Sequence, residues 1–127
     1  MPDVTRKNHP DLPVPGGTFH HSVRVGNLLF ISGFTAGNSD SINSGLGAQA
    51  ETVYQRLQAV LQAEGGSMRN VVKLTVFVTD MSELPDYRKV AQRYLEPAHY
   101  PASTLVQISR LVEPKAKIEI EAVAALD

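Results

Sequence analysis

The sequence contains no cysteine and no tryptophan among its 127 residues. The absence of cysteine excludes disulfide bonds, thiol nucleophiles and thiolate metal sites. Aromatic residues make up only 6% of the chain and the formal net charge is −1, so neither base stacking nor a positive field favours nucleic-acid binding. No apolar run approaches the roughly 20 residues of a membrane-spanning helix. We therefore expect no nucleic-acid or membrane partner and a cytoplasmic location.

The overall composition is that of a globular protein. Hydrophobic residues make up 43% and charged residues 20% of the chain. At this length we expect one domain, residues 1–127, with its own apolar core. Residues 1–16 are rich in proline and are predicted to form an extended N-terminal arm that is ordered only where it lies along a neighbour.

Alternating apolar residues predict five strands. The first two form a hairpin that turns at Gly26-Asn27, a glycine-containing pair typical of two-residue turns. In the third strand, Val72, Leu74, Val76 and Val78 are predicted to share one apolar face. The five predicted strands are residues 19–25, 26–33, 71–80, 103–110 and 117–125.

Helical spacing predicts two amphipathic helices. The first is indicated by residues three and four apart, namely Leu46, Ala50, Val53, Leu57, Val60 and Leu61. Gly65-Gly66 provides its C-terminal cap. The second is predicted to begin at Ser82 as N-cap, to bury Leu84, Tyr87, Ala91 and Tyr94 or Leu95, and to stop before Pro97.

The predicted order is β-β-α-β-α-β-β, an α+β fold. Two short amphipathic helices need a common apolar surface, so we expect both on one face of a single sheet. The other face is then left uncovered, although it carries apolar residues: Phe77, Leu105, Leu111, Val123 and Ala125. Such a face usually contacts a partner, and a second copy of the same chain is the partner we expect.

Four segments in this order resemble the RidA (YjgF/YER057c/UK114) family across nearly the whole chain. They are "VGNLLFISG" (25–33), "VVKLTVFVTDMSEL" (71–84), Pro101-Ala102 with the two residues that follow, and "RLV…KIEIEAVA" (110–124). The resemblance implies a chorismate-mutase-like fold, one mixed sheet and a homotrimer. It also implies that small carboxylated ligands bind in clefts between subunits, and that reactive enamines and imines are hydrolysed there without a cofactor.

The chain departs from the deaminase pattern of that family at three positions. Ser103, followed by Thr104, stands where archetypal members have an arginine that binds the substrate carboxylate. Phe19 replaces a tyrosine, and Arg88 stands at a position that is often asparagine. A serine hydroxyl cannot replace the charged fork of an arginine, so ordinary 2-imino acids should bind poorly unless another cation acts. Arg88 is either that cation or a solvated helix residue.

The resemblance gives Glu121 the proton-transfer role, with Glu119 interpreted as a surface carboxylate. Ser32 and Gly33 are candidate ligand contacts, because a glycine at a strand end allows close approach to the backbone. His20 or His21 is a candidate acid or base, since histidine titrates near neutral pH. Neighbouring residues on an extended segment point to opposite sides, and no metal-ligand spacing occurs elsewhere, so we expect no metal.

Three functions remain open. The first is a cofactor-free deaminase of small enamines or imines, with a 2-aminomuconate-like or pathway-specific substrate rather than a standard 2-imino acid. The second is a non-catalytic trimer that binds a small ligand. The third, a ribonuclease or translation inhibitor, has the least support because the chain has no clustered basic stripe.

Overall fold

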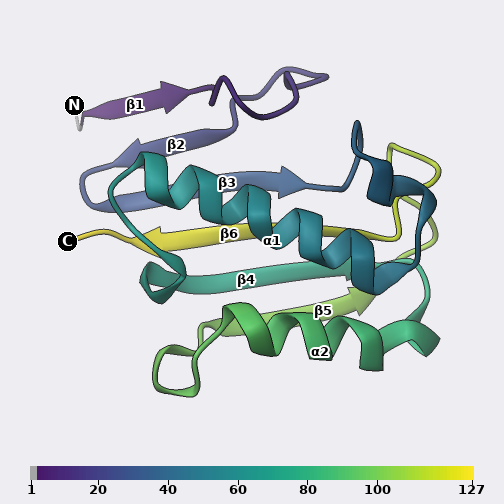
Figure 1. The fold of residues 1–127 in the computed structure, drawn as a ribbon. Helices are drawn as coiled ribbons and strands as arrows, with labels where there is room; N and C mark the ends of the chain where they lie inside the picture. The colour runs from purple at the N-terminus through teal and green to yellow at the C-terminus, as the bar shows by residue number, and fades with distance from the viewer. Residues whose placement is uncertain (1–2) are drawn as a thin grey trace.

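The computed structural model describes residues 3–127, in which two helices cover one face of a six-stranded mixed sheet (Figure 1). The strand order is β1-β2-β3-β6-β4-β5, with β4 and β5 parallel and every other neighbouring pair antiparallel. The elements are β1 (Val4–Lys7), β2 (Ser22–Val25), β3 (Leu28–Phe34), α1 (Leu46–Ala63), β4 (Val71–Val78), α2 (Leu84–Tyr94), β5 (Ala102–Gln107) and β6 (Ile118–Ala125). The predicted α+β arrangement is confirmed, with one additional strand.

The additional strand, β1, lies in the segment predicted to be an extended arm. Val4–Lys7 pairs antiparallel with β2, and Lys7 Nζ lies 2.9 Å from Glu64 Oε2 beyond the end of α1. All four residues of β1 are exposed, so no apolar alternation marks the strand in the sequence. Backbone pairing with β2, an otherwise open edge, orders it instead. Residues 1 and 2 of the expected arm lie outside the described residues.

The core lies between the helices and the sheet. Every residue of the predicted α1 stripe is buried, and β3, β4 and β6 present alternate apolar side chains to it. Tyr54 of α1 and Tyr87 of α2 join the helices through a 2.7 Å hydrogen bond between their hydroxyl groups. Burial raises the pKa of both phenols, so the pair stays neutral. In the described residues 3–127, no helix is both long and apolar enough to cross a membrane.

The glycines at the two predicted turns have the expected conformations. Gly26, between β2 and β3, has φ of 59°. Gly65 has φ of 81° after α1, and the Gly66 amide donates to the Leu61 carbonyl at 2.8 Å. Gly26 and Gly65 thus both adopt the left-handed backbone conformation, which residues with a side chain rarely adopt.

Three details of the predicted packing are wrong. A bulge between Val71 and Lys73 shifts the face of β4, so Val71 is buried and Val72 is 45% exposed. Leu105 pairs with buried Val76 and packs against the core, which removes it from the uncovered face. Ser82 is not the cap of α2.

The entry to α2 is instead built by a different residue. The Asp80 side chain accepts the Ser82 amide at 3.0 Å and caps a short 3-10 turn, residues 81–83. The α-helix then begins at Leu84, with Pro85 in its first turn. Proline suits this position because the amide it lacks would have had no partner within the helix.

The face opposite the helices, called the open face below, carries apolar side chains as predicted, except that Leu111 lies in the loop before β6 and not on the sheet. Leu28 and Phe30 of β3 flank core residue Leu29, so their side chains lie on the open face, where they are 40% and 43% exposed. Val106 of β5 joins them at 39%, in register with Phe77. Large exposed apolar side chains on one face of a sheet are typical of a surface that contacts a partner.

Candidate functional site

The candidate site is a cavity of about 460 Å³ where β3 ends and β6 begins. Its walls come from the N-terminal arm, the end of β3, α1, the loop before β6, and β6 itself. The end of β3 and the start of β6 lie at one end of the sheet, and α1 runs along the sheet beside them (Figure 1). The lining residues with the most bearing on ligand binding and catalysis are Phe19, Gly33, Arg56, Val112 and Glu119.

Glu119 is the acidic group that β6 contributes to the cavity. Its side chain is half-buried, and loss of water raises the pKa of its carboxyl group; the nearby Glu121 charge raises it further. A carboxyl group with a raised pKa can donate and accept protons closer to neutral pH. The interpretation of Glu119 as a surface carboxylate is therefore wrong.

Glu121 lies two residues further along β6 and is exposed. It shares the open face with Glu119, in register with Thr75 of β4, and it is not among the cavity's lining residues. Glu121 therefore acts on the cavity through its charge, which opposes ionisation of Glu119.

Gly33 sits against the Glu119 side chain at the end of β3. Pairing between β3 and β6 shifts between Ile31 and Phe34, so that Ser32 and Gly33 form an irregularity opposite Glu121. A Cβ atom on Gly33 would lie 2.7 Å from Glu119 Cδ and Oε2. Glycine is therefore needed here for close approach.

Ser32 fixes the arm rather than facing the cavity. Its Oγ donates to the His20 carbonyl at 2.6 Å, and its amide donates to the His21 carbonyl at 3.0 Å. His20 is exposed and does not line the cavity. Phe19, at the same turn of the arm, does line it, and its ring is half exposed.

His21 lines the cavity but has no free ring nitrogen. It is 2% exposed, its Nδ1 accepts the His9 amide at 2.8 Å, and its Nε2 lies 2.7 Å from the Pro13 carbonyl. A carbonyl only accepts, so Nε2 holds the proton and the ring is neutral. His9 is buried beside it, with Nε2 3.0 Å from Ser22 Oγ. His21 thus anchors the arm, a structural role that replaces the acid or base predicted for it.

Comparison with known proteins identifies the family. The family model described as endoribonuclease L-PSP matches residues 10–126. The chain belongs to this family, also called the YjgF or RidA family.

Named relatives agree with this assignment. The RutC family protein y4sK of Sinorhizobium fredii is 35% identical over 122 residues, covering 91% of this chain and 93% of the relative. A protein of Dermatophagoides farinae named 2-iminobutanoate/2-iminopropanoate deaminase is 27% identical, covering 93% of each chain. The crystal structure of RidA from a Psychrobacter species superposes with a TM-score of 0.87 at 31% identity, covering 96% of this chain and 99% of that one.

Within this RidA-family fold, three of the predicted ligand contacts lie away from the cavity. Arg88 is exposed on α2. Ser103 and Thr104 belong to β5, which β6 and β4 separate from β3. Ser103 is in register with core residue Leu74 and so faces the helix side, whereas Thr104 accepts a 2.9 Å hydrogen bond from Lys73 Nζ. A single chain does not bring these residues together with the cavity.

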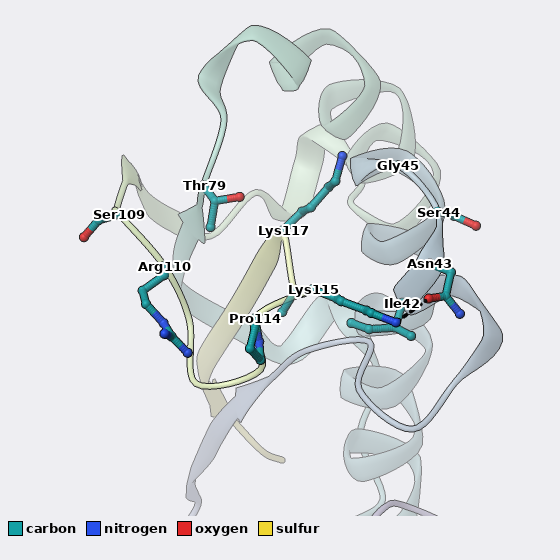
Figure 2. Close-up of a pocket in the computed structure, with 11 residues that line it drawn as sticks. Ile42, Asn43, Ser44, Gly45, Thr79, Ser109, Arg110, Pro114, Lys115 and Lys117 are labelled. Carbon is teal, nitrogen blue, oxygen red and sulfur yellow. Dashed lines mark hydrogen bonds between the residues drawn. The ribbon is translucent and has the colours of Figure 1, made fainter.

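A second cavity, of about 770 Å³, lies at the same end of the sheet and is lined by Arg110, Lys115 and Lys117 (Figure 2). Lys117 Nζ lies 3.2 Å from Glu83 Oε2, and the other oxygen of Glu83 accepts the Leu46 amide at the start of α1. The carboxylate of Glu83 therefore already occupies the anion position between the lysine and the helix N-terminus. The cavity containing Glu119 is the better candidate for chemistry.

Two residues of the RidA-family cavity escaped the sequence analysis. Glu119 was interpreted as a surface residue because it lies on the same strand face as Glu121, two residues away. The alternation pattern alone does not show which of the two carboxylates enters a cavity. Arg56 follows Val53 by three residues and precedes Leu57, which places it at the margin of the buried stripe of α1. That spacing was the available signal for Arg56.

Residues 3–127 contain no group of histidine, aspartate and glutamate side chains arranged to hold a metal ion.

Proposed function

We propose that this RidA-family protein hydrolyses small reactive enamines or imines to the carbonyl compound and ammonia. The observation that carries the proposal is the half-buried Glu119, whose raised pKa suits proton transfer, placed against Gly33 in a cavity. Membership of a family that includes a named 2-iminobutanoate deaminase supports the same reaction class.

The chemistry requires one proton donor and one water. The protonated Glu119 carboxyl group transfers its proton to the imine nitrogen, or to the carbon of an enamine, which makes the C=N carbon electrophilic. The resulting carboxylate accepts a proton from water as the water oxygen bonds to that carbon. Glu119 then returns this proton to the amine nitrogen of the carbinolamine. As the C–N bond breaks, the Glu119 carboxylate accepts the hydroxyl proton, which releases ammonia and the carbonyl compound and restores the acid. We assign this role to Glu119 in place of Glu121, whose charge keeps the Glu119 pKa raised.

The neighbouring groups favour binding of a small, partly apolar substrate. Gly33 has no side chain of its own, so the Glu119 side chain can lie directly against its backbone in the cavity wall. The rings of Phe19 and Phe34 and the side chain of Val112 supply apolar walls. Apolar walls reduce the water content of the cavity, which strengthens each electrostatic contact within it.

We further propose a homotrimer in which a neighbouring copy completes the site. The apolar open face supports self-association, and Thr104, which lies on that face, would reach a cavity only on another subunit. The absence of arginine at position 103 supports a substrate other than a standard 2-imino acid, such as a 2-aminomuconate-like enamine.

The test generates imines in situ with an amino-acid oxidase and measures their decay, with 2-aminomuconate assayed in parallel. We expect the wild type to accelerate hydrolysis and Glu119→Gln to lose activity by about 10²-fold or more, the size of a general acid-base contribution. Glu121→Gln should retain most of the activity with an acid-shifted pH profile. Equal activity in wild type and Glu119→Gln would refute the proposal. Ligand binding without turnover would favour a binding protein instead.

A further inference from the structure

Arg56 is a cation in the same cavity that has no carboxylate partner. It projects from α1, is half-buried, and its Nη1 donates to the Thr35 carbonyl at 2.6 Å. Within residues 3–127, no Asp or Glu oxygen lies within 4.0 Å of its guanidinium group. Burial lowers the pKa of Arg56, although the group stays charged at neutral pH.

Two other cations that contact α1 or its C-cap are neutralised by carboxylates there. Lys7 pairs with Glu64, and Arg93 pairs with Glu51 at 2.7 Å. A guanidinium group has five N–H donors, and the hydrogen bond to Thr35 uses one of them. A half-buried arginine with unused donors at a cavity wall is the arrangement that binds a carboxylate from outside.

The cation Arg56 and the acid Glu119 enter the cavity from different layers of the fold, the helices and the sheet. Glu119 comes from the sheet and Arg56 from α1, and they form no ion pair with each other. A ligand with an anionic end and a reactive C=N group can therefore engage both. Glu113 also lines the cavity, but it lies on an exposed loop where its Oε1 accepts the Lys115 amide at 3.2 Å.

We propose that Arg56 binds the carboxylate of the substrate and so supplies, from α1, the cation that Ser103 does not. The substrate is then a carboxylated imine or enamine, an inference that rests on the proposed function for its reactive group. Arg88, exposed on α2, has no part in this site.

The binding test uses two keto acids, pyruvate and levulinate, each paired with its uncharged primary amide. The two acids place the carboxylate at different distances from the carbonyl carbon. Calorimetry on the wild type should show at least one acid binding more tightly than its amide. Arg56→Gln keeps a donor for the Thr35 carbonyl but removes the charge; it should weaken binding of that acid at least tenfold and leave amide binding unchanged. Arg56→Lys should recover part of the affinity.

Arg24→Gln is the matched control. Arg24 also donates to a backbone carbonyl, that of Gly26 at 3.0 Å, but it lies at the β2–β3 hairpin outside the cavity. Its substitution should leave both affinities unchanged. The proposal is overturned if neither acid binds at millimolar concentration, if acids and amides bind equally to the wild type, or if Arg56→Gln weakens both alike. Where Arg56→Gln fails to fold, Arg56→Lys still tests the role of Arg56, and equal binding of acid and amide by the wild type would still overturn the proposal.

The outcome separates this inference from the proposed function. Binding of a keto acid that depends on Arg56, without turnover of any imine, would retain the carboxylate site and reject the deaminase. Turnover that depends on Glu119 but is unaffected in Arg56→Gln would retain the deaminase and reject the role of Arg56. Loss of affinity in Arg88→Gln with none in Arg56→Gln would transfer the role to α2.

Discussion

Gly33→Ala tests whether the contact between β3 and Glu119 sets the position of the acid. The backbone of Gly33 is not in the left-handed region, so alanine is acceptable to the main chain. Its Cβ would lie 2.7 Å from Glu119 Cδ and Oε2, about 0.7 Å short of the 3.4 Å at which ordinary contact begins. The flexible end of the glutamate must move by at least that amount.

The expected cost differs for stability and for activity. Moving a flexible side chain puts the stability loss near the low end for overpacking, about 1 kcal/mol, or about 4 °C in Tm. Displacing the acid by nearly 1 Å should lower kcat/KM by about 10²-fold. Thermal unfolding and the imine-decay assay measure the two effects separately.

Gly66→Ala is the matched control for this variant. Its Cβ would lie 2.7 Å from Leu126 Cδ2 and 3.1 Å from Asn70 Oδ1, so a similar loss of stability is expected at a site remote from the cavity. Activity should be retained. In a Glu119→Ala background the clash is absent, and Gly33→Ala should then cost little stability. An active Gly33→Ala enzyme, or an unchanged cost in that background, would refute the reasoning.

Two further predictions concern stability and assembly. Because folding raises the pKa of Glu119, the folded state binds this proton more tightly than the unfolded state, and wild-type stability falls as pH rises through the folded pKa. Thermal unfolding should therefore show a higher Tm for Glu119→Gln than for wild type at neutral pH, and this gain should disappear in acid, below the ordinary pKa of a glutamate carboxyl group; a gain that persists in acid would contradict this. Phe30→Glu places a charge on the open face and should convert the proposed trimer to a monomer in light scattering; a wild type that is already monomeric at micromolar concentration would reject the trimer.

The sequence by itself determined the elements that depend on local periodicity and turn chemistry. The α1 stripe, the Gly26-Asn27 hairpin and the glycine cap after α1 all follow from side-chain spacing and backbone freedom, which neighbouring residues settle among themselves. The apolar open face also followed, because alternation assigns side chains to faces wherever a strand is regular.

The tertiary structure decided what depends on pairing between distant strands. The bulge in β4 buries Val71 and exposes Val72, the reverse of the predicted faces, because one extra residue reverses the alternation. β1 forms only because the β2 edge is available to pair with it. Neither feature has a signal in the local sequence.

The identity of the site residues was decided in the same way. Glu119 and Glu121 are equivalent in alternation, and only the register of β6 against the end of β3 places Glu119 beside Gly33. Likewise Arg56 and Arg88 are both helix arginines, and helix packing puts the first in the cavity and leaves the second exposed. Spacing along a chain assigns a residue to a face, but the position of a side chain along that face depends on contacts between segments far apart in sequence.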